Sequence, residues 1–268
     1  IAEGHVARGI SVLEQAGCLQ LEAEVDAQIN QMVSDYLEMS PSERAETLLL
    51  AGTNQERLVL AGQLRQALQA EGVLGKDALA ISSLRRKDLT QVQAQYLVAY
   101  QPGDVLMPTQ DYKKQGLAKY QHYTVRSLDR EAQRLVVETA EGQLLSVDPA
   151  RCKRKTVYSS QRLDVAVGDR LRWTKNDRKT KTRNGQQFTV AKVDGETVRT
   201  VDESGQSRWV SLSGYQHVDY AWVSTTYSSQ GKTADRVLAL MSEKTTNRES
   251  FYVAVSRAKH GLKLYATD

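Results

Sequence analysis

Residues 47–72 read TLLLAGTNQERLVLAGQLRQALQAEG, and this stretch decides the fold class. Its first five residues form an apolar run of the length of a strand. From Asn54 to Glu71, apolar residues recur at three- and four-residue spacing, which is typical of a helix with one buried face, and Gly72 follows as a stop. A buried strand followed by an amphipathic helix predicts an α/β domain with a parallel sheet.

The residues before this stretch predict further helices. Apolar residues from Val6 to Leu13 share one helical face, and those from Leu21 to Met32 share another, so two amphipathic helices are expected. The sequence Ser-Pro-Ser-Glu at 40–43 is a capping box with proline at the first helical position. We therefore expect a short third helix directly before the strand.

From about Tyr100 the pattern changes to short alternating segments separated by Gly, Asp and Pro, which is typical of an all-β region. VETAEGQLLSV (137–147) and VAKVDGETVRTV (190–201) each predict a hairpin around a Gly-containing turn. Two blocks open on Gly-Asp, at 103–104 and at 168–169, so we expect one or two small SH3-like barrels in tandem. Asp202-Glu203 precedes Ser-Gly, which predicts a turn and not a metal site.

After Val218 the α/β pattern resumes. We expect strands at 220–225, 236–241 and 262–266, and a helix from Asn247 to Lys259 whose capping box pairs Thr246 with Glu249. The β region is therefore an insertion in one α/β domain. The predicted domains are 1–99 (helices and the first half), 100–216 (the insertion) and 217–268 (the second half).

Composition limits the class of protein. The 268 residues contain no run of 18 apolar residues, and the N-terminus lacks the layout of a secretory signal, so we expect no membrane contact. Cys18 and Cys152 match no metal-ligand spacing, so no metal site is expected, and two isolated thiols fit the reducing cytoplasm. The first residue is not methionine, so a fragment of a longer protein is expected.

Charge is unevenly distributed, and this indicates a polyanionic partner. Residues 1–75 hold 4 Arg and no Lys against 11 acidic residues, whereas residues 151–187 hold 12 basic residues against 3 acidic ones. The hairpin TKNDRKTKTRNG (174–185) is expected to expose its cations to DNA: Lys175, Arg178, Lys179, Lys181 and Arg183. A solvated charged surface is the alternative. Trp173, Tyr158 and Phe188 are either stacking faces for bases or core residues.

Residues 227–237, YSSQGKTADRV, end like a nucleotide-binding P-loop at Gly231-Lys232-Thr233. A P-loop requires an earlier glycine, and Thr226 stands at that position, so a P-loop is not expected. Arg257 lies near the end of the last predicted helix, where a cation can simply favour the helix dipole.

Two longer stretches change this interpretation. TTYSSQGKTADRV (225–237) and NRESFYVAVSRAKHGLKLY (247–265) closely resemble motifs V and VI of superfamily 1 DNA helicases of the RecD-like branch. Residues 48–68 resemble the motif IV strand and helix of these motors, and 168–195 resemble the β-barrel insertion before motif V. Residues 68–107 are most similar to the helicase part of TrwC/TraI-type conjugative relaxases.

The resemblance implies a RecA-like fold and a shared nucleotide site. In this family ATP lies between two RecA-like domains, and the first of them carries the P-loop and the carboxylates for magnesium. The chain resembles the second domain only, so ATP and Mg2+ are expected in the full-length parent and neither is expected to bind this fragment alone. The implied partners are the missing first RecA-like domain and single-stranded DNA.

The resemblance also implies roles for individual residues. Arg257 matches the motif VI arginine that reaches the γ-phosphate, and Gln230 and Gly231 match motif V residues that couple nucleotide state to DNA. The remaining matches are the expected nucleotide contacts Thr53, Asn54 and Arg57 and the expected DNA contacts Thr225, Tyr227 and Ser228. Tyr227 replaces the usual histidine and Ser228 the usual basic residue, which puts the transfer of their roles in doubt.

These implications give one leading function and two alternatives. The leading one is the C-terminal motor half of a cytoplasmic, ATP-dependent 5′-to-3′ DNA helicase within a conjugative relaxase. The first alternative is a vestigial helicase-like module that binds single-stranded DNA and is read as a translocation signal by the coupling protein of a type IV secretion system. The second is a DNA-binding barrel with no motor partner.

Overall fold

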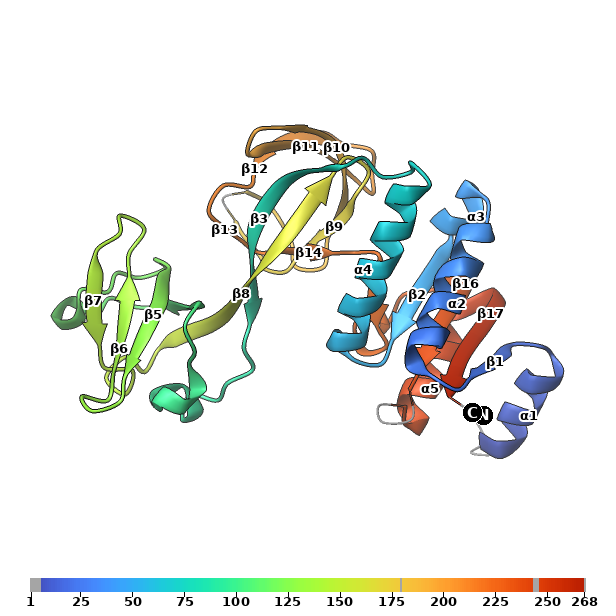
Figure 1. Cartoon of the computed structure of the whole chain (residues 1–268), viewed down its shortest axis with the longest axis horizontal. Helices are drawn as coiled ribbons and strands as arrows, with labels where there is room; N and C mark the ends of the chain where they lie inside the picture. The colour runs from blue at the N-terminus through green and yellow to red at the C-terminus, as the bar shows by residue number, and fades with distance from the viewer. Residues whose placement is uncertain (1–5, 179, 243–245, 268) are drawn as a thin grey trace. The chain divides into compact units, whose positions relative to one another are not determined.

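The structure is a computed structural model, and it describes residues 6–178, 180–242 and 246–267. The chain divides into two compact units, whose helices and strands are labelled in Figure 1. Unit 1 comprises residues 1–76, 168–170 and 220–268, and unit 2 comprises residues 77–167 and 171–219. The segment 168–170 therefore belongs to unit 1, although unit 2 flanks it on both sides in sequence.

Unit 1 is a five-stranded parallel sheet between helices, which confirms the predicted α/β class. Its strand order is β1 (Leu19–Glu22), β17 (Ala258–Thr267), β16 (Ala234–Met241), β2 (Thr47–Ala51) and β15 (Val223–Thr225). The helices are α1 (Val6–Gln15), α2 (Val25–Glu38), α3 (Pro41–Ala45), α4 (Asn54–Ala70) and α5 (Arg248–Arg257).

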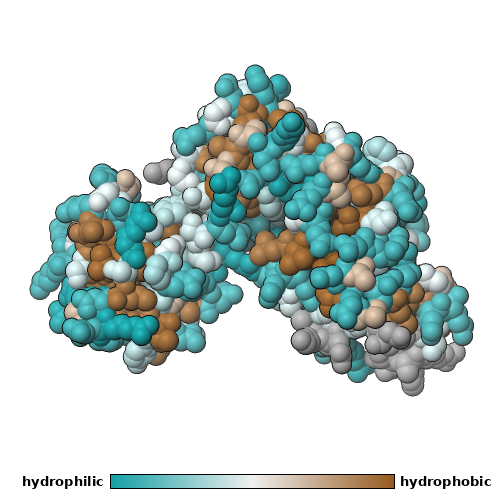
Figure 2. Space-filling view, in the orientation of Figure 1, coloured by the Kyte–Doolittle hydropathy of each residue, from teal (hydrophilic) through white to brown (hydrophobic). Residues whose placement is uncertain are grey.

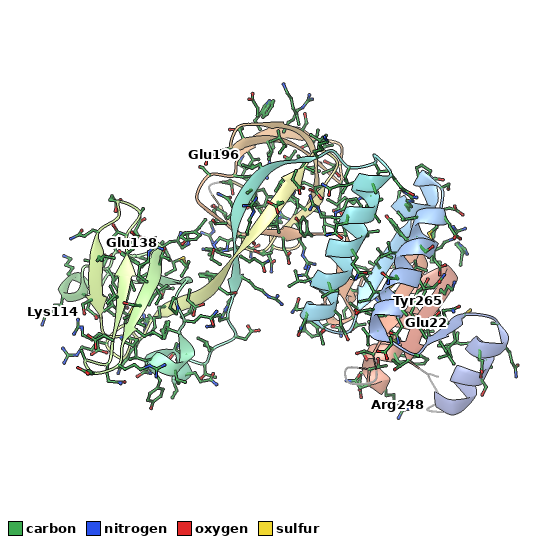
Figure 3. The ribbon with its side chains drawn as sticks, in the orientation of Figure 1. Glu22, Lys114, Glu138, Glu196, Arg248 and Tyr265 are labelled. Carbon is green, nitrogen blue, oxygen red and sulfur yellow. The ribbon has the colours of Figure 1, made fainter. Side chains whose placement is uncertain are left out.

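Neighbouring residues of β2 point to opposite faces of this sheet, because side chains alternate along a strand. Leu49 packs with Met32 of α2 and Leu64 of α4, whereas Leu50 packs with Phe251 of α5. Two apolar layers therefore enclose the sheet. On the first face, the hydroxyl of Tyr265 (labelled in Figure 3) donates to Asp35 of α2.

Local expectations in unit 1 are confirmed in part. The expected capping box of α3 and the expected stop at Gly72, with φ of +76°, are present, and α4 has a further capping box at Thr53 and Glu56 that was not predicted. Leu21 lies in strand β1 and not in a helix, because Gly17 ends α1 with φ of +68° and the following residues pair with β17. The cap of α5 is Asn247, which accepts from Ser250, and not Thr246 with Glu249.

Unit 2 is an all-β region of two sheets. The seven-stranded sheet has the order β13 (Tyr215–Gln216), β3 (Asp77–Arg86), β8 (Lys155–Ala166), β4 (Asp104–Pro108), β5 (Tyr123–Asp129), β6 (Arg134–Glu138), β7 (Leu144–Val147). The five-stranded sheet has the order β12 (Ser207–Ser211), β11 (Thr197–Asp202), β10 (Gln187–Asp194), β9 (Arg170–Trp173), β14 (Val218–Tyr220). Short 3-10 helices lie at Gln93–Gln95, Leu97–Ala99 and Lys113–Gln115.

The β region differs from expectation in where it begins and in whether its strands close into barrels. It begins with β3 at Asp77 and not near residue 100, so the boundary expected at 99/100 lies inside it. Both predicted hairpins are confirmed, as β6–β7 and β10–β11. The SH3-like barrels are not confirmed, because β3 and β8 pair along their length and join strands of both blocks into one sheet. The expected strand 220–225 is divided between β14 and β15, which lie in different sheets.

The two Gly-Asp pairs have the same local geometry. Gly103 and Gly168 have φ of +90° and +94°, a conformation that favours glycine, and the aspartate after each is buried. The carboxylate of Asp104 accepts from Lys87 Nζ at 2.7 Å. The carboxylate of Asp169 accepts two hydrogen bonds from the guanidinium of Arg65, at 2.7 and 2.8 Å.

Candidate functional site

The carboxyl edge of the parallel sheet gathers residues of motifs IV and V. β2 and β15 are paired up to Ala51 and Thr225, and the next amide, that of Thr226, donates to the carbonyl of Ala51 at 3.1 Å. Thr53 and Asn54 follow β2, and Ser228 follows β15 in the 3-10 helix η4 (Tyr227–Ser229). The parallel register therefore brings these polar side chains to one edge, as expected for successive strands of an α/β sheet.

Two threonines at this edge have similar hydrogen bonds. Thr53 Oγ1 accepts from the amide of Glu56 at 3.1 Å and caps α4. Thr225 Oγ1 accepts from the amide of Ser228 at 3.2 Å, and Ser228 Oγ accepts from the amide of Thr225 at 3.0 Å. Ser228 thus stabilises the local turn.

Arg57 is buried, with 1% of its surface exposed. Its Nε donates to Asn54 Oδ1 at 3.3 Å, and its Nη1 donates to the carbonyl of Tyr220 at 3.5 Å. The guanidinium therefore holds the start of α4 against the segment that leads into β15. Its expected role as a phosphate sensor remains a prediction.

The amino edge of the same sheet carries the motif VI arginine. Arg257 is the last residue of α5, and the residue after it, Ala258, pairs with Ala234 at the start of β16. The guanidinium donates from Nη1 to the carbonyl of Lys232 at 3.0 Å, from Nη2 to Ser256 Oγ at 3.1 Å and from Nε to the carbonyl of Val253 at 3.3 Å. Motif VI thus contacts the motif V loop directly.

The motif V loop runs between the two edges. Tyr227 is 81% exposed, and Gln230 is also exposed. Gly231 has φ of +82°, so a residue with a side chain would be strained there. The loop presents a phenol ring to solvent near the carboxyl edge and then turns at Gly231 toward the amino edge.

The predicted site residues therefore form two groups. Leu50 of β2 pairs with Ala239, so the end of β2 lies about six residues beyond Ala234. At about 3.3 Å per residue, this separates Thr53 and Asn54 from Arg257 by roughly 20 Å along the strands. A single phosphate cannot contact both groups. Thr53 and Asn54 are grouped with the expected DNA contacts Thr225 and Ser228, and not with the arginine expected to reach the nucleotide.

The cationic hairpin of unit 2 is exposed, as expected. Asp177 and Thr182 pair across it with two backbone hydrogen bonds of 3.0 Å. The side chains of Arg178, Lys181 and Arg183 are exposed, and Lys175 is half-buried with Nζ 3.6 Å from Met107 Sδ. Lys179 lies outside the described residues. The available cations are therefore placed at a solvent-facing tip.

The aromatic residues considered as stacking faces are core residues. Trp173 and Phe188 are 7% and 4% exposed, and their ring centroids lie 4.9 Å apart. Tyr158 is 5% exposed. A base cannot stack on rings that are already covered, so the core interpretation is confirmed.

Sequence reasoning missed a histidine pair in unit 2. The ring centroids of His122 and His217 lie 6.0 Å apart, and Tyr158 lies beside both. Burial, followed by the charge of Lys175, lowers the pKa of both imidazoles, and that of His217 falls to about 4. Both rings are therefore neutral at pH 7. The two residues are 95 positions apart, so no local sequence signal could have indicated the pair.

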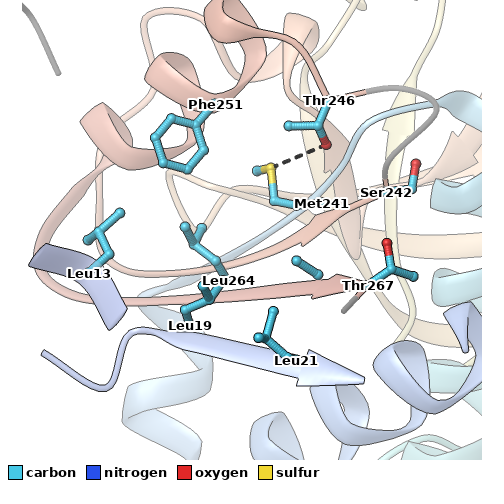
Figure 4. Close-up of a pocket in the computed structure, with 10 residues that line it drawn as sticks. Leu13, Leu19, Leu21, Met241, Ser242, Thr246, Phe251, Leu264 and Thr267 are labelled. Atoms are coloured by element: carbon cyan, nitrogen blue, oxygen red, sulfur yellow. Dashed lines mark hydrogen bonds between the residues drawn. The ribbon is translucent and has the colours of Figure 1, made fainter. Parts of the chain in front are cut away.

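A separate apolar pocket of about 570 Å³ lies between α1, β1 and α5 (Figure 4). Leu13, Leu19, Phe251 and Leu264 line it, and none of the predicted site residues does.

Hydrophilic residues surround the apolar patches on the face drawn in Figure 2. In the described parts of the chain, every helix is too short or too polar to cross a bilayer. Those parts also hold no cluster of three His, Cys, Asp or Glu side chains suited to a metal ion.

Two family models match the sequence. The model described as DNA relaxase TraI 2B/2B-like domain matches residues 83–165, and the viral superfamily 1 RNA helicase core domain matches residues 143–266. The multifunctional conjugation protein TraI of Escherichia coli is 26% identical over 248 residues, which cover 88% of this chain and 14% of TraI. The conjugal transfer protein TraA of Rhizobium radiobacter is 32% identical over 114 residues, which cover 41% of this chain and 10% of TraA.

Solved helicase structures align more loosely. A structure of two coordinating Pif1 helicases at forked double-stranded DNA covers 91% of this chain and 47% of its own, with 13% identity and a TM-score of 0.41. Bacteroides Pif1 in complex with ADP-AlF3 and single-stranded DNA covers 93% and 49%, with 15% identity and a TM-score of 0.28. The sequence matches support a TraI-like superfamily 1 helicase region related to conjugative relaxases.

Proposed function

We propose that this chain, a TraI-like superfamily 1 helicase region, is the C-terminal motor half of an ATP-dependent 5′-to-3′ DNA helicase within a conjugative relaxase. The observation that supports this most is the 3.0 Å hydrogen bond from Arg257 Nη1 to the carbonyl of Lys232. It joins the arginine expected at the nucleotide to the loop expected at the DNA. The chain spans only 14% of the length of TraI, so the remaining motor parts lie elsewhere in such a parent.

Arg257 is suited to stabilise phosphoryl transfer. A guanidinium has five N–H donors, and the hydrogen bonds within the described chain use three of those of Arg257. Two donors remain for the γ-phosphate of an ATP held with Mg2+ by the first RecA-like domain. Positive charge placed there stabilises the transition state, and such arginines contribute about 10³ to 10⁵ in rate.

The carboxyl edge is suited to a DNA strand. Tyr227 has an exposed ring at this edge, whereas the amides and hydroxyls of Thr53 and Thr225 already donate to Glu56 and Ser228. An exposed ring can stack on a base. Because the motif V loop leaves this edge and ends against Arg257, a strand bound at one edge can alter the arginine at the other.

The test is single-strand-stimulated ATPase activity of the full-length parent. Arg257→Ala should lower the rate at least about a hundredfold and leave single-strand binding intact. Lys259→Ala is the matched control, because Lys259 is 54% exposed and only pairs with Asp235 at 3.3 Å on the surface. Its rate should be unchanged. A parent whose ATPase activity is equal in both variants would contradict the proposal.

The translocation-signal alternative is favoured by one feature, the use of Ser228 as a turn cap where the family has a basic residue. A surface signal should survive Arg257→Ala in a delivery assay with a conjugation apparatus. It should be lost on changes to exposed residues of unit 2. A parent without ATPase activity that is still delivered would support this alternative over the motor.

A further inference from the structure

A row of three exposed side chains crosses the five-stranded sheet of unit 2. Lys192 of β10 is paired with Arg199 of β11, and Arg199 is paired with Trp209 of β12. Directly paired residues lie on the same face of a sheet, so the three side chains are neighbours there. All three are exposed, and Trp209 is 51% exposed.

Trp209 differs from the other two tryptophans of the chain. Trp173 and Trp222 are 7% and 9% exposed and belong to the cores of their units. Trp209 lies on β12, the edge strand of its sheet, so one side of the indole faces no neighbouring strand of that sheet. About half of the indole surface is therefore open to solvent and available to a stacking partner.

One of the two cations lies over the indole, and the other is bonded beside it. Lys192 Nζ lies 6.0 Å from the centroid of the Trp209 ring. Arg199 Nη2 donates to Ser207 Oγ at 3.3 Å, two residues before Trp209 and therefore on the same face of β12. Neighbouring strands lie about 4.8 Å apart, so both charges are within roughly 10 Å of the indole. That distance suits the phosphates on either side of a stacked base.

The acidic groups near this row are in turns. Asp202 Oδ1 accepts from the amides of Ser204 and Gln206, so this carboxylate is occupied by the β11–β12 turn. Glu196 (labelled in Figure 3) and Asp194 flank the β10–β11 turn. The residue before Trp209, Arg208, donates to the carbonyl of Thr180 at 2.7 Å, which holds the cationic hairpin beside β12.

We propose that the row Lys192, Arg199 and Trp209 binds single-stranded DNA, with one base stacked on the indole and the flanking phosphates on the two cations. The inference rests on the proposed function, since it specifies where that function's DNA strand contacts unit 2. Stacking on an aromatic side chain accepts any base, because every base has a π-face. The row therefore reads no sequence, as a translocating motor requires.

The experiment uses the 268-residue chain and its intrinsic fluorescence. Titration with a thymidine oligonucleotide should quench the exposed indole, and an abasic oligomer of the same length should bind without quenching. Trp209→Ala should weaken binding of the thymidine oligomer about tenfold, whereas Trp209→Phe should retain most of the affinity. Tyr120→Ala is the matched control, because Tyr120 is 59% exposed with Lys119 Nζ 4.7 Å from its ring.

Lys192→Gln with Arg199→Gln gives a second readout. Loss of two phosphate contacts should reduce the slope of log K against log salt by roughly 1.4, at about 0.7 per contact on a single strand. Binding that is unaffected by Trp209→Ala and by this pair would overturn the inference and leave the proposed function standing. DNA binding would likewise be unaffected by these variants if the row bound another protein and not DNA. A wild-type chain that does not bind the oligomer at all would also overturn the inference, whereas the proposed function is tested separately by the ATPase activity of the full-length parent.

Discussion

Asp104 and Asp169 each follow a glycine in the left-handed conformation and each open a β block, but they hold different partners. Asp104 pairs with Lys87, and both residues belong to unit 2. Asp169 pairs with Arg65 of α4 and also accepts from Trp222 Nε1 at 3.3 Å, and all three belong to unit 1. The same dipeptide thus closes a turn inside the insertion in one case and fixes the chain to the α/β unit in the other.

The two ion pairs differ in burial, and this difference determines how much the loss of each pair should reduce the free energy of unfolding. The side chains of Arg65 and Asp169 are 8% and 0% exposed, and the pairing is bidentate. Lys87 is 25% exposed, so water can reach the cation that neutralises Asp104. Removing one member of a fully buried pair leaves a charge without solvent, whereas water can replace a partly exposed partner.

The largest effect is therefore expected for Asp169→Ala. It leaves the guanidinium of Arg65 buried without its carboxylate, which should reduce the free energy of unfolding of unit 1 by about 3–5 kcal/mol. Denaturant unfolding followed by the fluorescence of Trp222, with Trp173→Phe and Trp209→Phe as background, measures this unit. The double variant Arg65→Met, Asp169→Leu should recover much of the loss. A loss below about 1 kcal/mol would show that the pair does not anchor the segment.

The second effect concerns the histidines, because His122 lies in the first block and His217 in the second. The folded pKa of His217 is about 4, below its ordinary value of 6.5. Its contribution to stability is thus complete above pH 6.5 and is lost as the pH falls from 6.5 toward 4. Partial exposure of the ring reduces the expected loss to about 2 kcal/mol.

Unfolding of unit 2 at pH 7 and pH 4.5 measures this loss, and His217→Gln should remove most of the pH dependence that the imidazole causes. His260 is an exposed histidine of unit 1, so His260→Gln is the control. Equal pH dependence in the two variants would mean that the buried histidines do not cause the pH dependence of the stability of unit 2.

The third effect is Lys87→Met, which removes the cation from Asp104 and the hydrogen bond from Nζ to the carbonyl of Ala99. Because the partly exposed position of Lys87 admits water and Asp104 Oδ2 keeps the hydrogen bond from the amide of Gln101 at 3.0 Å, the free energy of unfolding of unit 2 should fall by only about 1–2 kcal/mol. If chemical denaturation shows a loss equal to that of Asp169→Ala, the two Gly-Asp pairs would be energetically equivalent.

The smallest effect on stability is expected at the cationic hairpin (174–185), which is an exposed part of the second β block. Lys181→Gln with Arg183→Gln should change the free energy of unfolding by less than about 0.5 kcal/mol. The same variant should reduce the salt dependence of single-strand binding by a slope of roughly 0.7 per lost phosphate contact. An unchanged slope would leave the hairpin as a solvated charged surface.

The sequence predicted those parts of the fold that depend on neighbouring residues. The β2–α4 pair was predictable because the apolar run, the helical spacing and the stop at Gly72 all act locally. Strand β1 was not, because Leu21 has helical spacing with later residues and becomes a strand only by pairing with β17. β3 was missed for a similar reason, since its partner β8 lies about 80 residues away.

The candidate site shows the same division. The family motifs indicated Arg257 and Gly231 together, and the two motifs are in contact at Lys232. Motif order could not indicate that Thr53 and Asn54 lie at the opposite edge from Arg257, because edge position depends on strand register. The exposed tryptophan was missed because only the sheet order makes β12 an edge strand.

The short return of residues 168–170 to unit 1 has a consequence for how such a gene can change. A side chain at Gly168 would lie 2.9 Å from Leu74, and the amide of Ala221 donates to the carbonyl of Arg170 at 2.8 Å. Each of the two segments 77–167 and 171–219 therefore leaves and re-enters its host at neighbouring points. Segments with adjacent ends can be lengthened, shortened or exchanged with little disturbance to the host. Each segment thus has the end geometry of an insertable cassette, although the strands of the two segments share a sheet.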